Sequence, residues 1–124
     1  MNAVNKLHDK SMEFAQKAFM AQKQGDIKKF IELSIQAYHL EKRAAMLLID
    51  NIHSLDRTVL FKSSAFLAFD AKKYMDAKEL LTEAKKGLTI PENIRIELFK
   101  LERDINFELN SLEFEANKKN TIQP

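Results

Sequence analysis

The chain has 124 residues, a formal net charge of +2 and no cysteine. A chain of this length is expected to form one domain, and the lack of cysteine excludes disulfides, thiolate metal sites and thiol nucleophiles. Two glycines, two prolines and a charged fraction of 31% favour long helices over a turn-rich β fold. No segment has the pattern of a signal peptide or a membrane span, so a cytoplasmic location is expected.

The first two predicted helices form a hairpin. Residues 2–24 place apolar side chains at intervals of three and four, which is typical of an amphipathic helix. Gly25 is expected to end this helix in the left-handed conformation that glycine adopts without strain, and Asp26 to cap the next one. The second helix is predicted over residues 27–50, which is longer than a simple hairpin requires. The polar segment 50–56 then ends it, because Asn, Asp and Ser side chains compete for backbone hydrogen bonds.

A second hairpin follows. Ser54 or Asp56 is expected to cap a third helix over residues 57–70, since both are good N-cap residues. A fourth helix over residues 74–86 is predicted to end at Gly87, which would again supply a left-handed residue after the last turn.

A long fifth helix is predicted over residues 91–116, followed by a flexible polar tail over residues 118–124. Residues 1–117 are thus expected to form a single helical domain. One apolar stripe of the fifth helix is expected to cover the preceding helices; it consists of Ile94, Leu98, Leu101, Ile105 and Leu112.

A second apolar row on the fifth helix is expected roughly 60° to 100° from the first. It consists of Ile96, Phe99, Phe107 and Phe114. Because a wide apolar patch on a monomer usually marks a contact site, the row predicts a homodimer formed through the C-terminal helix. The alternative is that the end of the second helix covers this row within one chain, through Leu47, Leu48 and Ile52.

The chain contains an internal repeat with an offset of 47 residues, the distance from Phe14 to Phe61. Identical residues recur at this offset, mostly small or bulky apolar ones: Phe14/Phe61, Ala18/Ala65, Phe19/Phe66, Ala21/Ala68, Glu32/Glu79, Leu33/Leu80 and Ala37/Ala84. Small residues at fixed positions let two helices approach closely, and bulky residues fill the space beside them. The sequence therefore predicts two similar helical hairpins, over about residues 11–44 and 58–91.

This spacing resembles the tetratricopeptide repeat. The second unit fills that family's register with Phe61, Ala65, Tyr74, Ala77, Leu81 and Ala84, and the first unit with Phe14, Ala18, Ile27, Phe30, Ser34 and Ala37. The first unit departs from the family at Phe30 and Ser34, and the offset exceeds the usual period of about 34 residues. The resemblance implies an all-α fold of five helices, with two hairpins stacked as a short α-solenoid and a long C-terminal capping helix.

The resemblance also implies a function. It indicates a non-catalytic protein–protein interaction module, or adaptor, that binds a peptide or helix in a groove lined by the first helix of each hairpin. By register, the groove residues are Met12, Phe19, Lys23, Lys62, Phe66 and Phe69. The alternative that Phe66 and Phe69 pack as core residues remains open, because aromatic residues at helical spacing are often buried.

The sequence has two further resemblances. The first unit alone is similar to the three-helix microtubule-interacting-and-transport domain, which binds short helical motifs. The whole layout is similar to small uncharacterised bacterial helical-repeat proteins, which implies no catalytic residues.

No residue pattern points to catalysis, a metal or a cofactor. His8, His39 and His53 lie on different predicted elements, and a metal site would need at least three convergent ligands. Glu41, near His39, is expected to be an exposed helix charge. Both glycines are expected to end helices rather than to form a phosphate-binding loop. We therefore expect neither enzyme activity nor a bound metal or cofactor.

The alternative function is a nucleic-acid-associated or regulatory accessory protein that uses lysine-rich helix ends. Lysine pairs occur at residues 28–29, 72–73, 85–86 and 118–119. A strip that binds single-stranded nucleic acid usually combines cations with aromatic residues on one face, and these pairs lack that arrangement. The sequence therefore favours a protein partner.

Overall fold

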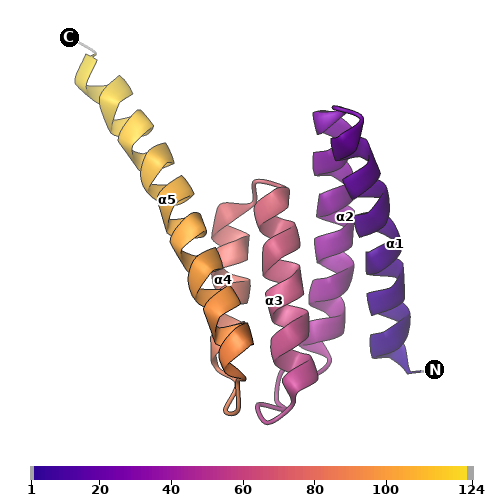
Figure 1. Ribbon diagram of the computed structural model, residues 1–124. Coiled ribbons are helices and arrows are strands. Elements are labelled where there is room, and N and C mark those ends of the chain that lie inside the picture. Colours follow the sequence, from indigo (N-terminus) through magenta and orange to yellow (C-terminus); the bar gives the residue numbers. More distant parts are fainter. Residues whose placement is uncertain (1, 123–124) are drawn as a thin grey trace.

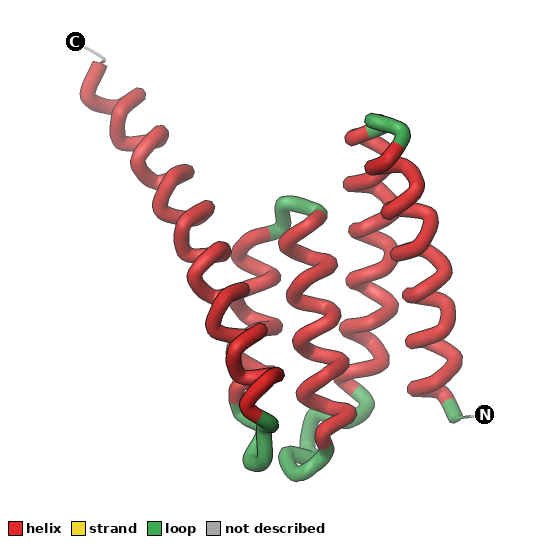
Figure 2. The backbone as a smooth tube through the Cα atoms, in the orientation of Figure 1, coloured by secondary structure: helices red, strands yellow, loops and turns green. Residues whose placement is uncertain are grey.

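The computed structural model describes residues 2–122 and contains five α-helices and no strand in that range. The helices are α1 (Ala3–Lys23), α2 (Ile27–Met46), α3 (Leu55–Asp70), α4 (Tyr74–Lys85) and α5 (Glu92–Ile122). Each helix packs against the next one along the chain. In Figure 1 they stand side by side from α1 to α5, and Figure 2 shows the short loops that join them. The predicted all-α fold class is confirmed.

The turn between α1 and α2 forms as predicted. Gly25 has a φ of 77°, which places it in the left-handed region that favours glycine. The Asp26 side chain accepts a hydrogen bond from the Lys29 backbone N–H at 3.2 Å and so caps α2.

The second helix ends earlier than predicted, at Met46, and residues 47–50 form turns. Arg57 from α3 accounts for part of this difference, because its Nε donates a hydrogen bond to the Ile49 carbonyl at 2.8 Å. Ser54, rather than Asp56, caps α3: its hydroxyl oxygen accepts a hydrogen bond from the Arg57 backbone N–H at 3.3 Å.

Gly87 does not have the left-handed conformation that the sequence predicts. Among the described residues, only Gly25 and Lys72 have a positive φ. A Cβ atom at position 87 would instead overlap Thr58 Oγ1 of α3. Glycine is therefore needed at this position because the end of α4 approaches α3 closely.

Alanine dominates the contacts between neighbouring helices. Alanines that are at most 2% exposed occur on all of the first four helices: Ala18, Ala21, Ala37, Ala44, Ala45, Ala65, Ala68, Ala77 and Ala84. Their short side chains let the helix backbones come close together at the density of a normal protein interior. The repeat alanines are thus buried in both units.

Arg57 is buried among three backbone and side-chain acceptors. Besides its bond to Ile49, its Nη1 donates to the Glu83 carbonyl at 2.7 Å and its Nη2 to Glu83 Oε2 at 2.9 Å. The guanidinium carbon also lies 4.8 Å from the centre of the Phe61 ring. One side chain of α3 therefore joins the end of α2 to the last turn of α4.

The predicted covering stripe of α5 is correct in its first part. Ile94, Leu98, Leu101 and Ile105 are buried, whereas Leu112 is exposed. The reason is length, because α4 has 12 residues and α5 has 31. Figure 1 shows the C-terminal part of α5 extending beyond the other helices. The helix continues to Ile122, past its expected end near residue 116, and the flexibility of the tail stays a prediction.

The second apolar row of α5 lies on the side away from the other helices, not 60° to 100° from the stripe. Successive residues of a helix are about 100° apart, so Ile96 lies roughly 200° from Ile94. Ile96, Phe99, Phe107 and Phe114 are 47 to 70% exposed. The end of α2 therefore does not cover this row, which we call the α5 outer row.

The close helix contacts generate a stability prediction. Replacing Ala65 or Ala84 with Leu should destabilise the fold by about 1–3 kcal/mol, because neither site has room for a larger side chain. Thermal unfolding measures the effect, and Ala116→Leu on the exposed end of α5 is the matched control. Unchanged melting temperatures for both core variants would contradict the close-packed arrangement.

Candidate functional site

The residues expected to form a groove lie on α1 and α3. In Figure 1 these two helices are nearer to the viewer than α2 and α4. We call the set Met12, Phe19, Lys23, Lys62, Phe66 and Phe69 the α1/α3 face. Phe19 and Phe66 occupy equivalent positions of the two units and are 53% and 38% exposed. The packing of Phe66 as a core residue is therefore excluded.

Phe19 carries a cation on its ring. Lys23 Nζ lies 4.8 Å from the centre of the Phe19 ring, which is within the range of a cation–π interaction. Met12, two turns before Phe19, is also exposed. This part of the surface is thus apolar with a positive charge at one end.

Two of the six residues are already engaged within the chain. Lys62 Nζ forms an ion pair with Glu97 of α5, and its side chain is only 17% exposed. The Phe69 ring is half-buried and makes an edge contact with Tyr74 at a centroid distance of 5.4 Å. Lys62 and Phe69 therefore already have partners within the chain, and their place in a groove stays a prediction.

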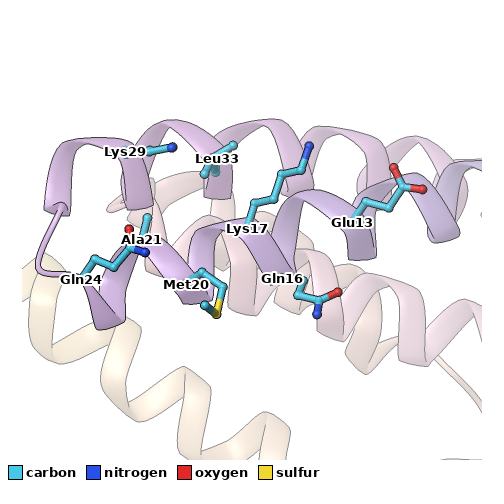
Figure 3. Close-up of a pocket in the computed structure, with 8 residues that line it drawn as sticks. All are labelled: Glu13, Gln16, Lys17, Met20, Ala21, Gln24, Lys29 and Leu33. Atoms are coloured by element: carbon cyan, nitrogen blue, oxygen red, sulfur yellow. The ribbon is translucent and has the colours of Figure 1, made fainter.

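A hollow of about 770 Å³ opens between α1 and α2 (Figure 3). It is lined by Glu13, Gln16, Lys17, Met20 and Ala21 of α1, by Gln24 directly after that helix, and by Lys29 and Leu33 of α2. The repeat offset relates Glu13, Lys17 and Gln24 to Leu60, Ser64 and Ala71, which are buried in the second unit.

These equivalent positions explain the hollow. In the second unit, α3 packs against both α2 and α4, whereas α1 packs mainly against α2. Longer polar and charged side chains stand on this side of α1 in place of Leu60, Ser64 and Ala71, and they face water. The hollow is thus lined by a solvated side of α1.

Glu41 is the main unexpected polar residue. It is fully buried, not exposed as predicted, and its Oε1 lies 2.8 Å from His8 Nδ1 of α1. Its Oε2 has no hydrogen-bond partner among the described residues. Burial raises the pKa of Glu41, and the hydrogen bond to His8 opposes that rise. The pair His8–Glu41 crosses the α1–α2 contact and could not be recognised from spacing along one helix.

Tyr38 of α2 joins its helix to two others. Its hydroxyl donates a hydrogen bond to Asp76 Oδ2 of α4 at 2.9 Å, and its carbonyl accepts one from the Ser64 hydroxyl of α3 at 3.0 Å. Burial, followed by the hydrogen bond to Asp76, raises the pKa of Tyr38 to about 12. Tyr38 is therefore a neutral structural donor at ordinary pH.

In residues 2–122, no group of three His, Cys, Asp or Glu side chains is arranged to hold a metal ion. Two of the lysines at helix ends already have carboxylate partners: Lys85 pairs with Glu102 at 2.5 Å and Lys86 with Glu83 at 2.7 Å. None of the helices described is long and apolar enough to cross a bilayer.

Comparison of the chain with protein-family models, curated proteins and solved structures finds no match. The function of the α1/α3 face is therefore inferred from its own side chains. The distinctive property of this face is the exposure of Phe19 and Phe66, which occupy equivalent positions in the two units.

Glu41 generates a prediction about pH. Because the pKa of Glu41 is raised on folding, its contribution to stability falls as the pH rises from about 4.5 through the folded-state pKa. Glu41→Gln should remove this fall, so the variant should gain stability relative to the wild type as the pH rises. Urea unfolding at pH 4.5, 5.5 and 7 measures the difference, with Glu32→Gln on the exposed side of α2 as control. A constant difference between Glu41→Gln and wild type across this range would contradict the assignment.

Proposed function

We propose that this chain is a non-catalytic protein–protein interaction module that binds a helix or peptide on the α1/α3 face. The exposure of Phe19 and Phe66 supports this proposal, because each directly follows a buried alanine, Ala18 or Ala65. Close packing of the helices requires the alanine. It does not require an exposed aromatic residue at the next position. Exposed aromatic residues are enriched at sites where proteins meet.

The chemistry of the face indicates the kind of partner. An amphipathic helix presents apolar side chains one turn apart, and these fit an apolar surface such as Phe19, Phe66 and Met12. The flexible thioether of Met12 adapts to different apolar shapes. A carboxylate on the partner would meet Lys23 at the edge of the surface. We therefore propose an amphipathic helix with at least one acidic residue beside its apolar side.

Nucleic-acid binding and self-association remain alternative predictions. The nucleic-acid alternative loses two of its cations to internal ion pairs, at Lys85 and Lys86, and one arginine, Arg57, is buried. Self-association through α5 is a second candidate, supported by the exposed α5 outer row. The cytoplasmic location stays a prediction from the sequence.

The binding proposal is tested with the substitutions Phe19→Glu and Phe66→Glu. Purified wild-type chain is immobilised, a captured protein is identified from a host lysate, and its binding segment is synthesised as a peptide. Calorimetry with that peptide should show at least about 30-fold weaker binding for Phe66→Glu, the effect of a 2 kcal/mol contact. Met75→Glu, at an exposed apolar residue of α4, should leave binding unchanged.

Two results would overturn the proposal. Equal peptide binding by wild type, Phe19→Glu and Phe66→Glu would move the contact away from the α1/α3 face. Capture of DNA or RNA, with an affinity that falls steeply as salt increases, would favour the nucleic-acid alternative, because phosphate contacts release counterions.

A further inference from the structure

The residues of the α5 outer row line two shallow hollows of similar size. The first, about 480 Å³, is lined by Glu92, Arg95, Ile96, Phe99, Lys100 and Arg103. The second, about 560 Å³, is lined by Phe107, Asn110, Ser111, Phe114, Glu115 and Lys118. The hollows run from residue 92 to 103 and from 107 to 118, so they lie at equal distances on either side of Ile105.

This spacing makes the helix surface suitable for pairing with itself. In an antiparallel pair of α5 helices, a two-fold axis would lie at the level of Ile105. The first hollow of each copy would then lie against the second hollow of the other copy. Ile96 would then face Phe114 of the second copy, and Arg103 would face Phe107 of the second copy. A two-fold axis repeats each contact, and a guanidinium on an aromatic ring adds a cation–π attraction.

The charges beside the row favour the antiparallel direction. Arg95, Lys100 and Arg103, with one carboxylate at Glu92, line the first hollow, whereas one carboxylate and one cation, Glu115 and Lys118, line the second. Asp104 lies between them and pairs with Arg103 at 3.7 Å. Antiparallel pairing therefore places the basic half on a half without an excess of cations, and brings Arg95 near Glu113 of the second copy. Parallel pairing would place Arg103 against Arg103 and Lys100 against Lys100, and such like-charge contacts are unfavourable.

The length of α5 gives a second reason for a mate. Beyond Leu109 the helix leaves the other helices, and Leu112 and Phe114 are both exposed. A helical segment without tertiary contacts is only marginally stable in water. A second α5 lying along the same helix would cover Phe114 and support this end.

We infer that two copies of this chain pair through antiparallel α5 helices, with Ile96 of each copy against Phe114 of the other and Arg103 against Phe107. This inference rests on the proposed self-association and specifies its direction and register. The pairing uses the side of α5 opposite to its contact with α4, and so leaves the α1/α3 face of both copies free. Such a dimer presents two binding faces, which raises the apparent affinity for a repeated partner.

Disulfide cross-linking tests the register, because the chain contains no cysteine. The variants Ile96→Cys and Phe114→Cys are prepared separately, one with a mass-distinguishing tag, then mixed and oxidised mildly. A disulfide forms when the two Cα atoms are about 4.4–6.8 Å apart. We expect the mixed 96–114 disulfide to dominate over either homodisulfide, and Met75→Cys on α4 to give none.

Two results would overturn the inference. Homodisulfides from each variant alone, without enrichment of the mixed product, would indicate parallel pairing and overturn the inference. A wild-type monomer by sedimentation at micromolar concentration, together with no disulfide, would overturn self-association itself. In the dimer, Arg103→Glu should weaken association about tenfold, while Arg43→Glu, on the exposed side of α2, should not change it.

The same assay separates this inference from the binding proposal. Phe19→Glu and Phe66→Glu lie outside the α5 outer row, so they should weaken peptide binding and leave the mixed disulfide intact. Loss of peptide binding with no disulfide would keep the binding proposal and reject the dimer, and the reverse pattern would keep the dimer alone.

Discussion

Buried alanines set the distance between neighbouring helices, and the positions of the larger side chains follow from this constraint. Helices that meet through Ala18, Ala37, Ala65 and Ala84 leave little volume for aromatic rings between them. Of the nine phenylalanines in the chain, only Phe61 is fully buried. The others lie partly or largely at the surface. The same close contacts that stabilise the fold thus bring aromatic residues to the outside, where they are available to partners.

Buried polar groups define how the helices are arranged within this close packing. Arg57 satisfies the Ile49 and Glu83 carbonyls, so it fixes the end of α2 relative to the last turn of α4. Removing one partner of such a buried charge costs more than the pair itself contributes, because the remaining groups lose their hydrogen bonds. Glu41 is less well satisfied, because its Oε2 has no hydrogen-bond partner among the described residues, and burial raises its pKa.

The sequence predicts the elements whose signals are local. The helix pattern, the turn at Gly25 and the cap at Asp26 depend on neighbouring residues, and all three are confirmed. The early end of α2 and the need for glycine at position 87 depend on Arg57 and Thr58, which belong to α3. Contacts of this kind have no periodic signal, which is why spacing alone predicts these two features incorrectly.

In the candidate site, too, local signals are predicted and contacts with other helices are not. Phe19 and Phe66 could be predicted as surface residues because the repeat register places them together on the first helix of each unit. Lys62 and Phe69 share that register, but their side chains contact Glu97 of α5 and Tyr74 of α4. The buried pair His8–Glu41 was missed because its members are far apart in sequence and on different helices. An alignment at the repeat offset does reveal the polar side of α1 that lines the hollow.

The roles proposed for the phenylalanines depend on which of these rings are open to water. Hydroxyl-radical footprinting, read by mass spectrometry at low and high protein concentration, measures this for each ring. We predict that Phe61 is protected at every concentration, that Phe19 and Phe66 react at every concentration, and that Phe107 and Phe114 become protected as the concentration rises. Protection of Phe19 and Phe66 equal to that of Phe61 in the dilute chain would contradict the account, because both would then belong to the core.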